Sequence, residues 1–133
     1  MANAFIGNYL RLELLSRDGR TRQVAEETNG FFLAMAETTG TLWEHTDQRA
    51  SCNHGFAAHV IRWITRDVLG IERIDPPTKT ITLRRVATVP SWCRATLPVG
   101  GQWFSLEWDE TSGATLRFSA PEGYRVVAPA GSK

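Results

Sequence analysis

The first half of the chain repeats its apolar residues at intervals of three and four, which is the spacing of one face of an α-helix. This pattern predicts three helices, over residues 4–17, 21–37 and 54–69. The first two are separated by a short turn and are expected to form an antiparallel hairpin. Asn29-Gly30 lies inside the second, where it costs about 1 kcal/mol in helix propensity and predicts a kink or a split. The residues expected to face a core are Phe5, Ile6, Tyr9, Leu10 and Leu14 in the first helix, and Phe56, Val60, Ile61, Ile64 and Val68 in the third.

Residues typical of helix ends flank these segments. Asp18-Gly19 follows the first helix and Gly70 follows the third, and glycine readily adopts the left-handed conformation that ends a helix. Side-chain oxygens that accept hydrogen bonds from the first turn mark the starts. We therefore expect Thr21 to cap the second helix, and Asn53 or Ser51 to cap the third.

The period of the pattern changes to two after Ile74-Asp75-Pro76-Pro77, where two prolines remove backbone donors and restrict their neighbours. Alternation of this kind predicts half-buried strands, and turn residues between them predict a small antiparallel sandwich or meander. The fold class is therefore α+β, with helices first and strands second. The apolar positions are Ile81, Leu83, Phe104, Leu106, Trp108, Leu116, Phe118, Tyr124 and Val126, and the turns are Gly100-Gly101, Thr111-Ser112-Gly113 and Glu122-Gly123.

Composition narrows the choice of partners. The 133 residues suit one medium domain or two small ones, with 42% hydrophobic and 22% charged residues and a formal net charge of +1. This balance gives no electrostatic reason to expect nucleic acid or an anionic membrane as a partner. No stretch approaches the length of a membrane span, and no signal segment is present, so the sequence leaves the cellular location unknown.

The cysteines and histidines do not form a metal motif. Cys52 and Cys93 have neither the paired spacing of a zinc site nor the pattern of a disulfide framework, and we expect both to be free thiols. His54 and His59 are five residues apart, about 140° around a helix, so they do not face one metal ion. No metal and no cofactor is expected. A thiol and imidazole pair formed by Cys52 and His54 lacks an identifiable third group.

The strongest candidate for chemistry lies in the polar break between the second and third helices. Glu44 stands between Trp43 and His45, and His54 follows nine residues after His45. A carboxylate beside an indole and an imidazole suits a carbohydrate site, where apolar sugar faces stack and hydroxyl groups need acceptors. By default, Glu44 would be a solvated loop carboxylate, Trp43 a core residue and His54 a helix-cap or packing residue.

A second group of aromatic residues lies among the predicted strands. Trp92, Trp103 and Trp108 could form a sugar-binding platform on the sheet. Alternating aromatic residues in a small sandwich more often form its core, and we expect the core role here. Solvent exposure of these tryptophans separates the two roles.

Two segments resemble the C-terminal end of bacterial α-L-rhamnosidases. The family pattern Thr-Thr-hydrophobic-Trp-Glu is present as Thr39-Gly40-Thr41-Leu42-Trp43-Glu44, with a different lead-in, and the family's Asn-His pair is present as Asn53-His54. The order of elements is similar over nearly the whole chain. The resemblance implies that residues 1–72 are the last helices of an (α/α)6 catalytic barrel and that residues 75–133 are the β-sandwich that follows it.

The family's activity is hydrolysis of terminal α-L-rhamnosyl residues with inversion. The resemblance implies that Glu44 is the general base, that His54 binds the sugar, and that Trp43 contributes to the same site. The family's general acid comes from a part of the barrel with no counterpart here. We therefore expect the chain to be a fragment that is inactive alone, with exposed helix faces that favour self-association. The alternative is a carbohydrate-binding or structural module without catalysis, in which the β-rich part binds the ligand.

Overall fold

The computed structural model describes residues 6–45, 47–84, 90–109 and 116–130. The chain divides into two compact units, Met1–Asp67 and Val68–Lys133. The first is helical and the second is built from strands, so the α+β class predicted from the sequence is confirmed. The division comes before the two prolines that we expected to mark it, because a strand already begins at Ile71.

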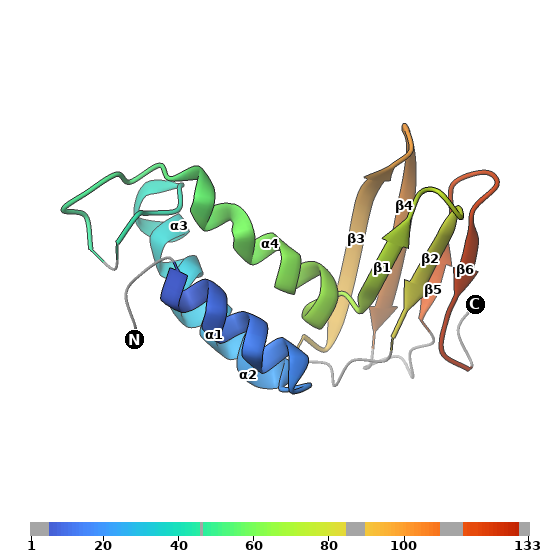
Figure 1. Cartoon of the computed structure of the whole chain (residues 1–133), viewed down its shortest axis with the longest axis horizontal. Helices are drawn as coiled ribbons and strands as arrows, with labels where there is room; N and C mark the ends of the chain where they lie inside the picture. The colour runs from blue at the N-terminus through green and yellow to red at the C-terminus, as the bar shows by residue number, and fades with distance from the viewer. Residues whose placement is uncertain (1–5, 46, 85–89, 110–115, 131–133) are drawn as a thin grey trace. The chain divides into compact units, whose positions relative to one another are not determined.

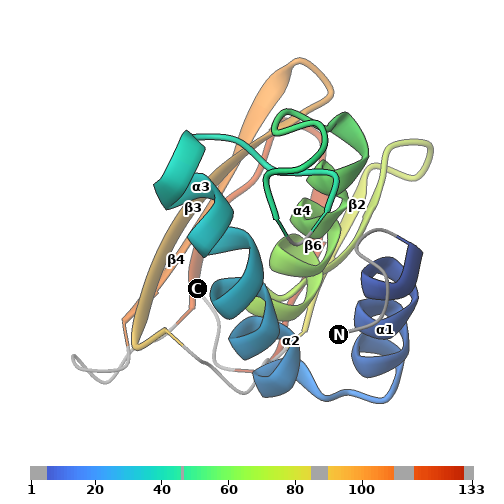
Figure 2. The ribbon, with the colours of Figure 1, turned by 90° about the vertical axis from the view of Figure 1, so that its left-hand side faces the viewer.

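The helical unit begins with α1 (Ile6–Arg17), followed by a helical run that consists of α2 (Thr21–Thr28), a π-helical segment η1 (Asn29–Leu33) and α3 (Ala34–Thr39). α1 lies alongside α2 (Figure 1 and Figure 2). The break predicted at Asn29-Gly30 is therefore a π-helical turn inside a continuous helix. The expected cap at Thr21 is wrong, because Arg20 occupies the N-cap position and makes no side-chain cap bond, while Thr21 is buried in the first turn.

The third helical run covers the predicted span in three pieces: a 3-10 segment η2 (Gly55–His59), α4 (Val60–Trp63) and a second π-helical segment η3 (Ile64–Val68). Its N-cap is His54, which is extended and makes no side-chain cap bond, rather than Asn53 or Ser51. Gly70 has a φ of 72°, as expected for a residue that ends a helix.

The core of the helical unit differs from the predicted stripe. Ile6, Leu10 and Leu14 are exposed, whereas Leu12 and Leu15 of the same helix are buried. The first helix carries apolar residues on several sides, so periodicity alone did not identify the buried side. On the third run Phe56 and Ile61 are exposed, while the buried core consists of Leu12, Leu15, Val24, Phe32, Met35, Val60 and Trp63. The predicted core residue Phe5 and the start of the predicted first helix lie outside the described residues.

The second unit contains two three-stranded sheets. One has the order β1 (Ile71–Asp75), β2 (Thr80–Leu83), β6 (Arg125–Val127), and the other has the order β3 (Trp92–Val99), β4 (Gln102–Asp109), β5 (Arg117–Ser119). Strand β1 differs from the expectation, which places residues 71–72 in the helical part. All described strand pairs are antiparallel except β2 and β6, which are parallel, so the expectation of a purely antiparallel unit is wrong in that place.

The inner faces of the two sheets share one apolar core. It contains Ile71, Ile81, Leu83, Val99, Phe104, Leu106 and Trp108, and Leu116, Phe118, Tyr124 and Val126 pack against it. The alternation read from the sequence therefore assigned the inward positions correctly. Gly100 and Gly101, with φ values of 59° and 78°, close the tight turn between β3 and β4 as predicted, because both positions need the left-handed conformation. The predicted turn at Thr111-Ser112-Gly113 lies outside the described residues.

Candidate functional site

The loop between α3 and the third helical run folds back on itself. Gly40 ends α3 in the left-handed conformation, with a φ of 74°. Two backbone hydrogen bonds then join the arms of the loop: the Glu44 N–H donates to the Ser51 carbonyl at 2.8 Å, and the His54 N–H donates to the Leu42 carbonyl at 2.9 Å. The hydroxyl of Thr41 also donates to the Cys52 carbonyl. These bonds bring Glu44 and the Asn53-His54 pair, which are nine residues apart, to the same place.

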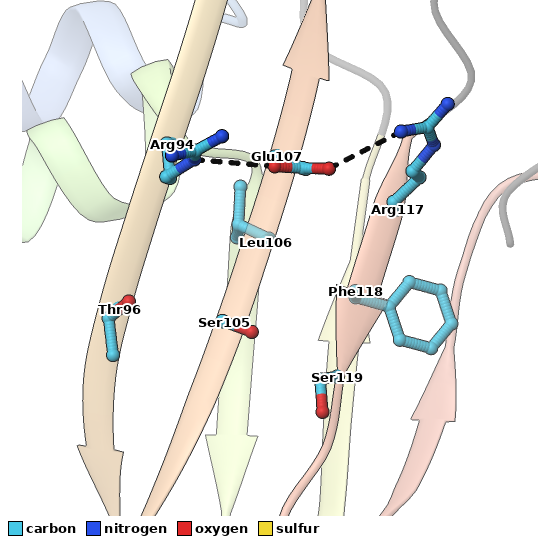
Figure 3. Close-up of a pocket in the computed structure, with 8 residues that line it drawn as sticks. All are labelled: Arg94, Thr96, Ser105, Leu106, Glu107, Arg117, Phe118 and Ser119. Carbon is cyan, nitrogen blue, oxygen red and sulfur yellow. Dashed lines mark hydrogen bonds and ion pairs between the residues drawn. The ribbon is translucent and has the colours of Figure 1, made fainter.

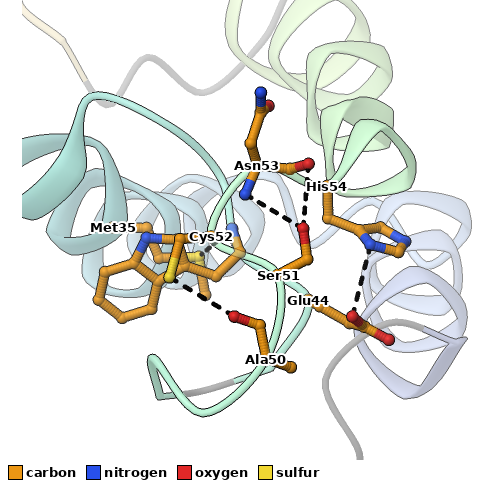
Figure 4. Close-up of polar contacts among 8 residues, drawn as sticks. Met35, Glu44, Ala50, Ser51, Cys52, Asn53 and His54 are labelled. Atoms are coloured by element: carbon orange, nitrogen blue, oxygen red, sulfur yellow. Dashed lines mark hydrogen bonds and ion pairs between the residues drawn. The ribbon is translucent and has the colours of Figure 1, made fainter.

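The Glu44 carboxylate faces the imidazole of His54 (Figure 4). The Glu44 Oε2 to His54 Nδ1 distance is 3.8 Å, and about a third of each side chain is exposed, 36% for Glu44 and 34% for His54. Both polar groups are thus accessible to a ligand from solvent. At this separation a hydroxyl group or water that approaches the carboxylate is also within reach of the imidazole.

Trp43 lies in a different environment from Glu44 and His54. Its side chain is partly buried and packs against the helical core, and its indole N–H donates to the Thr39 hydroxyl at 2.7 Å. Its backbone N–H contacts the Met35 sulfur at 3.4 Å. This environment matches the default expectation of a core residue. Trp43 anchors the loop to the end of α3, and any contact with sugar would be made by the part of the ring that remains exposed.

The other carboxylate of the loop is already paired. Arg49 contacts Asp47 at 2.6 Å and also donates its backbone N–H to it. The side-chain hydrogen bond from Arg49, followed by the backbone hydrogen bond, holds the pKa of Asp47 below its usual value. Asp47 is therefore a poor proton donor near neutral pH.

Cys52 lies in the same loop as Glu44 and His54. The Cys52 sulfur contacts the Ala50 carbonyl at 3.7 Å, and Cys52 and Cys93 are both free thiols. No group of three or more His, Cys, Asp or Glu side chains among the described residues is placed to hold a metal ion. None of the helices in the described ranges has the length and apolarity needed to cross a bilayer.

His59 lies in an aromatic cluster that sequence reasoning missed. Its ring contacts those of Tyr9, Phe32, Phe56 and Trp63, with centroid distances of 5.2 to 5.8 Å. Burial lowers the pKa of His59, and a hydrogen bond between Nδ1 and the Phe56 carbonyl partly opposes that change. The cluster is not apparent from local sequence, because Tyr9 and Phe32 come from other helices.

The three tryptophans of the sheet unit divide into two kinds. Trp108 is 8% exposed and belongs to the core, as the sequence predicted. Trp92 and Trp103 are each 66% exposed, so the expectation that all three are core residues is wrong for these two. Strand alternation explains the difference, because Trp103 and Trp108 are five positions apart on β4 and therefore point to opposite faces.

Comparison with known proteins adds no relative. No protein-family model matches the chain, and neither the curated proteins nor the solved structures contain a match. The structure itself shows the α+β class.

Proposed function

We propose that the loop between α3 and the third helical run carries the general base and one sugar-binding residue of an inverting α-L-rhamnosidase. The observation that carries this proposal is the approach of Glu44 to His54, at 3.8 Å, on an accessible loop. The two residues belong to separate motifs of the family that the sequence resembles. Their convergence in the loop supports a shared role.

In this role Glu44 accepts a proton from a water molecule as the water oxygen bonds to the anomeric carbon of rhamnose. The bond from that carbon to the leaving oxygen breaks at the same time, and a carboxylic acid on the opposite side of the sugar protonates the leaving oxygen. His54 hydrogen-bonds hydroxyl groups of the ring and so fixes the anomeric carbon relative to Glu44. An exposed carboxylate is suited to the role of base because water must reach it.

The general acid must come from outside the local loop. Inverting enzymes hold the two carboxyl groups about 6.5 to 9.5 Å apart across the sugar. Asp47 has its pKa lowered by Arg49, and Glu37 is on the last turns of the helical run that leads into the same loop. We propose that further barrel helices supply the acid. The exposed apolar side chains of Ile6, Leu10 and Leu14 support this, because they are four residues apart and form one uncovered stripe on α1.

Two measurements on this chain test the proposal. Incubation with a chromogenic α-L-rhamnoside should release no aglycone, because the acid is missing. Titration with L-rhamnose, followed by amide NMR, should shift resonances in residues 42–54, with a dissociation constant no tighter than about 1 mM, near −4 kcal/mol. His54→Gln should reduce these shifts. If the chain released aglycone and Glu44→Gln abolished the release, the expectation that the chain lacks the general acid would be wrong. If the shifts were confined to other parts of the chain, the proposed sugar site would be wrong.

The decisive test of the base is in an enzyme where these residues complete a barrel. Glu44→Gln keeps the shape of the side chain but removes the basic oxygen, so kcat should fall by about 10² to 10⁴ while rhamnose binding persists. Glu37→Gln is the matched control and should leave kcat within a few-fold of the original. Wild-type turnover in Glu44→Gln would assign the base to another carboxylate, with Asp47 and Glu37 next to be tested.

A second candidate function is carbohydrate binding by the sheet unit without catalysis. The exposure of Trp92 and Trp103 favours it, because large aromatic side chains are usually withdrawn from solvent unless a ligand covers them. It does not compete with the role of Glu44, since the residues involved are different.

A further inference from the structure

The outer face of the sheet formed by β3, β4 and β5 has an ordered arrangement of side chains. Strand alternation places every second residue of each strand on this face, and the register of the pairs fixes which side chains lie opposite one another. Four rows cross the sheet. They are Trp92 with Asp109, then Arg94 with Glu107 and Arg117, then Thr96 with Ser105 and Ser119, and finally Pro98 with Trp103.

The two central rows, together with Leu106 and Phe118, line a shallow cavity of about 400 Å³ (Figure 3). This volume is within the range of small-ligand sites. Glu107 lies between two guanidinium groups, 3.3 Å from Arg94 and 3.5 Å from Arg117, which holds all three side chains across the sheet. The hydroxyl groups of the next row lie beside them, and the ring of Phe118 points away from this row.

The two exposed tryptophans flank the cavity at opposite ends. Trp92 is two residues before Arg94 on β3, and Trp103 is two residues before Ser105 on β4, so each adjoins a central row on the same face. Three row spacings of two residues separate the tryptophans, about 20 Å along the strands. A single sugar ring cannot span that distance, whereas a chain of several rings can.

The distribution of charge indicates a neutral ligand. The described residues of this face carry two positive charges, on Arg94 and Arg117, and two negative charges, on Glu107 and Asp109. These cancel, so the face has no net attraction for a polyanion such as nucleic acid. It nevertheless offers many donors and acceptors close together, which suits neighbouring hydroxyl groups.

The order of apolar and polar residues also distinguishes the face from a typical protein interface. Such interfaces have an apolar centre and a polar rim. Here the polar rows are central, and the apolar side chains of Trp92, Pro98 and Trp103 are at the two ends. An oligosaccharide fits this order because each ring offers an apolar face for stacking and hydroxyl groups along its edges.

We propose that this outer face binds a neutral oligosaccharide of several rings, with terminal rings stacked on Trp92 and Trp103 and central hydroxyl groups bound by the Arg94, Glu107, Arg117 and Thr96, Ser105, Ser119 rows. The site is separate from the loop that carries Glu44, and the proposal rests on the second candidate function, carbohydrate binding by the sheet unit. It holds the ligand without reacting with it. Trp108 takes no part, because it faces the core.

The test is calorimetric titration of the full chain with four neutral hexasaccharides: cellohexaose, xylohexaose, mannohexaose and maltohexaose. At least one should bind, with D-glucose binding too weakly to detect. Trp103→Ala and Trp92→Ala should each weaken binding about tenfold or more, and Trp103→Phe should recover most of the affinity because it restores an aromatic face. Arg117→Gln should weaken binding as well, since it removes one arm of the central row.

Two controls separate this site from general effects on folding. Val127→Ser alters an exposed apolar residue of β6 in the other sheet and should leave affinity unchanged. Circular dichroism of every variant should match that of the original chain. The proposal is overturned if none of the four hexasaccharides binds, if the tryptophan substitutions leave affinity unchanged, or if sedimentation shows that Trp103 instead joins two copies of the chain.

Discussion

The helical unit and the sheet unit differ in how they separate apolar side chains from solvent. On β4 the two faces alternate strictly, since Phe104, Leu106 and Trp108 are buried on one face and Trp103 is exposed on the other. On α1 it is incomplete, because Leu12 and Leu15 are buried while Leu10 and Leu14 are exposed. A strand has only two faces, whereas a helix offers a full circle of directions, so an excess of apolar residues on a helix leaves some uncovered.

The two units also differ in where their polar side chains lie. The helical unit buries several polar groups, among them Ser16, whose hydroxyl donates to the buried Asp67 carboxyl at 2.6 Å across 51 residues of sequence. The core of the sheet unit is formed by apolar side chains, and the polar side chains of β3 to β5 lie on the outer face. The helical unit is therefore held together by specific polar pairs as well as by packing. The sheet unit depends on packing.

The largest effect is expected from Trp108→Ala. It removes a buried aromatic side chain and should lower the free energy of unfolding of the sheet unit by about 3 to 5 kcal/mol. Trp103→Ala is the matched variant on the other face of the same strand and should change it by less than about 0.5 kcal/mol. Chemical denaturation followed by circular dichroism measures both. Equal losses would show that β4 does not separate its two faces.

A somewhat smaller effect is expected in α1 from Leu12→Ala, at about 2 to 5 kcal/mol, because the side chain is fully buried. Leu14→Ala is the matched control and should stay within about 0.5 kcal/mol. Leu14→Lys should in addition reduce any self-association of the chain, which sedimentation measures. A large loss of stability in Leu14→Ala would show that the exposed stripe is covered within the chain itself.

The contribution of buried polar pairs is tested by Ser16→Ala. It removes a donor from the buried carboxyl of Asp67 and should cost about 1 to 3 kcal/mol. Thr65→Ala removes an exposed hydroxyl that donates to the carbonyl of Ile61 in its own helix, and should have little effect. If the two variants were equally stable, the helical unit would depend on packing alone, like the sheet unit.

A smaller effect is a dependence on pH that we expect from the helical unit. Burial lowers the pKa of His59, so below about pH 6.5 the unfolded chain takes up a proton that the folded chain does not. Stability from this source is complete above that pH and decreases as the pH falls toward the lower pKa of the folded state. Measurement of unfolding from pH 8 to pH 5 should show the decrease, and His59→Phe should remove it while His45 and His54 remain.

A second decrease, from a different pair, should follow at lower pH. The hydrogen bond from Arg11 lowers the pKa of Glu27, so this contribution is present above the ordinary pKa of glutamate, near pH 4.3, and is lost as the pH falls below it. Because the Arg11 side chain is about half exposed, we expect this second decrease to be weak. Glu27→Gln should remove it without changing the first.

The sequence predicted the class of the fold and most of the sheet core, because period-two alternation assigns each strand residue to one of two faces. It missed β1, since Ile71 and Glu72 follow the third helix too closely to be distinguished from it, and it missed the parallel pairing of β6 with β2, which depends on tertiary contacts. On the helices, it predicted the segments but not the buried side. Trp63, one of the largest fully buried residues, was not among the predicted core positions.

The candidate site was predicted in part. Glu44 and His54 were selected from motifs, and the backbone bonds that bring them together could not be derived from local sequence. The outer face of the sheet was only partly anticipated. From the sequence alone, the three tryptophans formed one group. The register between β3 and β4 separates Trp103 from Trp108. It also places the arginine and hydroxyl rows between the two exposed tryptophans.

The π-helical segment Asn29–Leu33 bears on the candidate site, because the rotation of the helix about its axis decides which way its last residues face. Each residue added to or removed from a helix turns everything beyond it by about 100°. α3 leaves this segment with Met35 in the core and with Thr39 directed at the indole of Trp43, which fixes the start of the loop that carries Glu44. A π-helical turn holds about one residue more than an α-helical turn, so it takes up an extra residue without rotating the helix beyond it. Met35, Thr39 and the loop that carries Glu44 therefore keep the direction that an uninterrupted α-helix would give them.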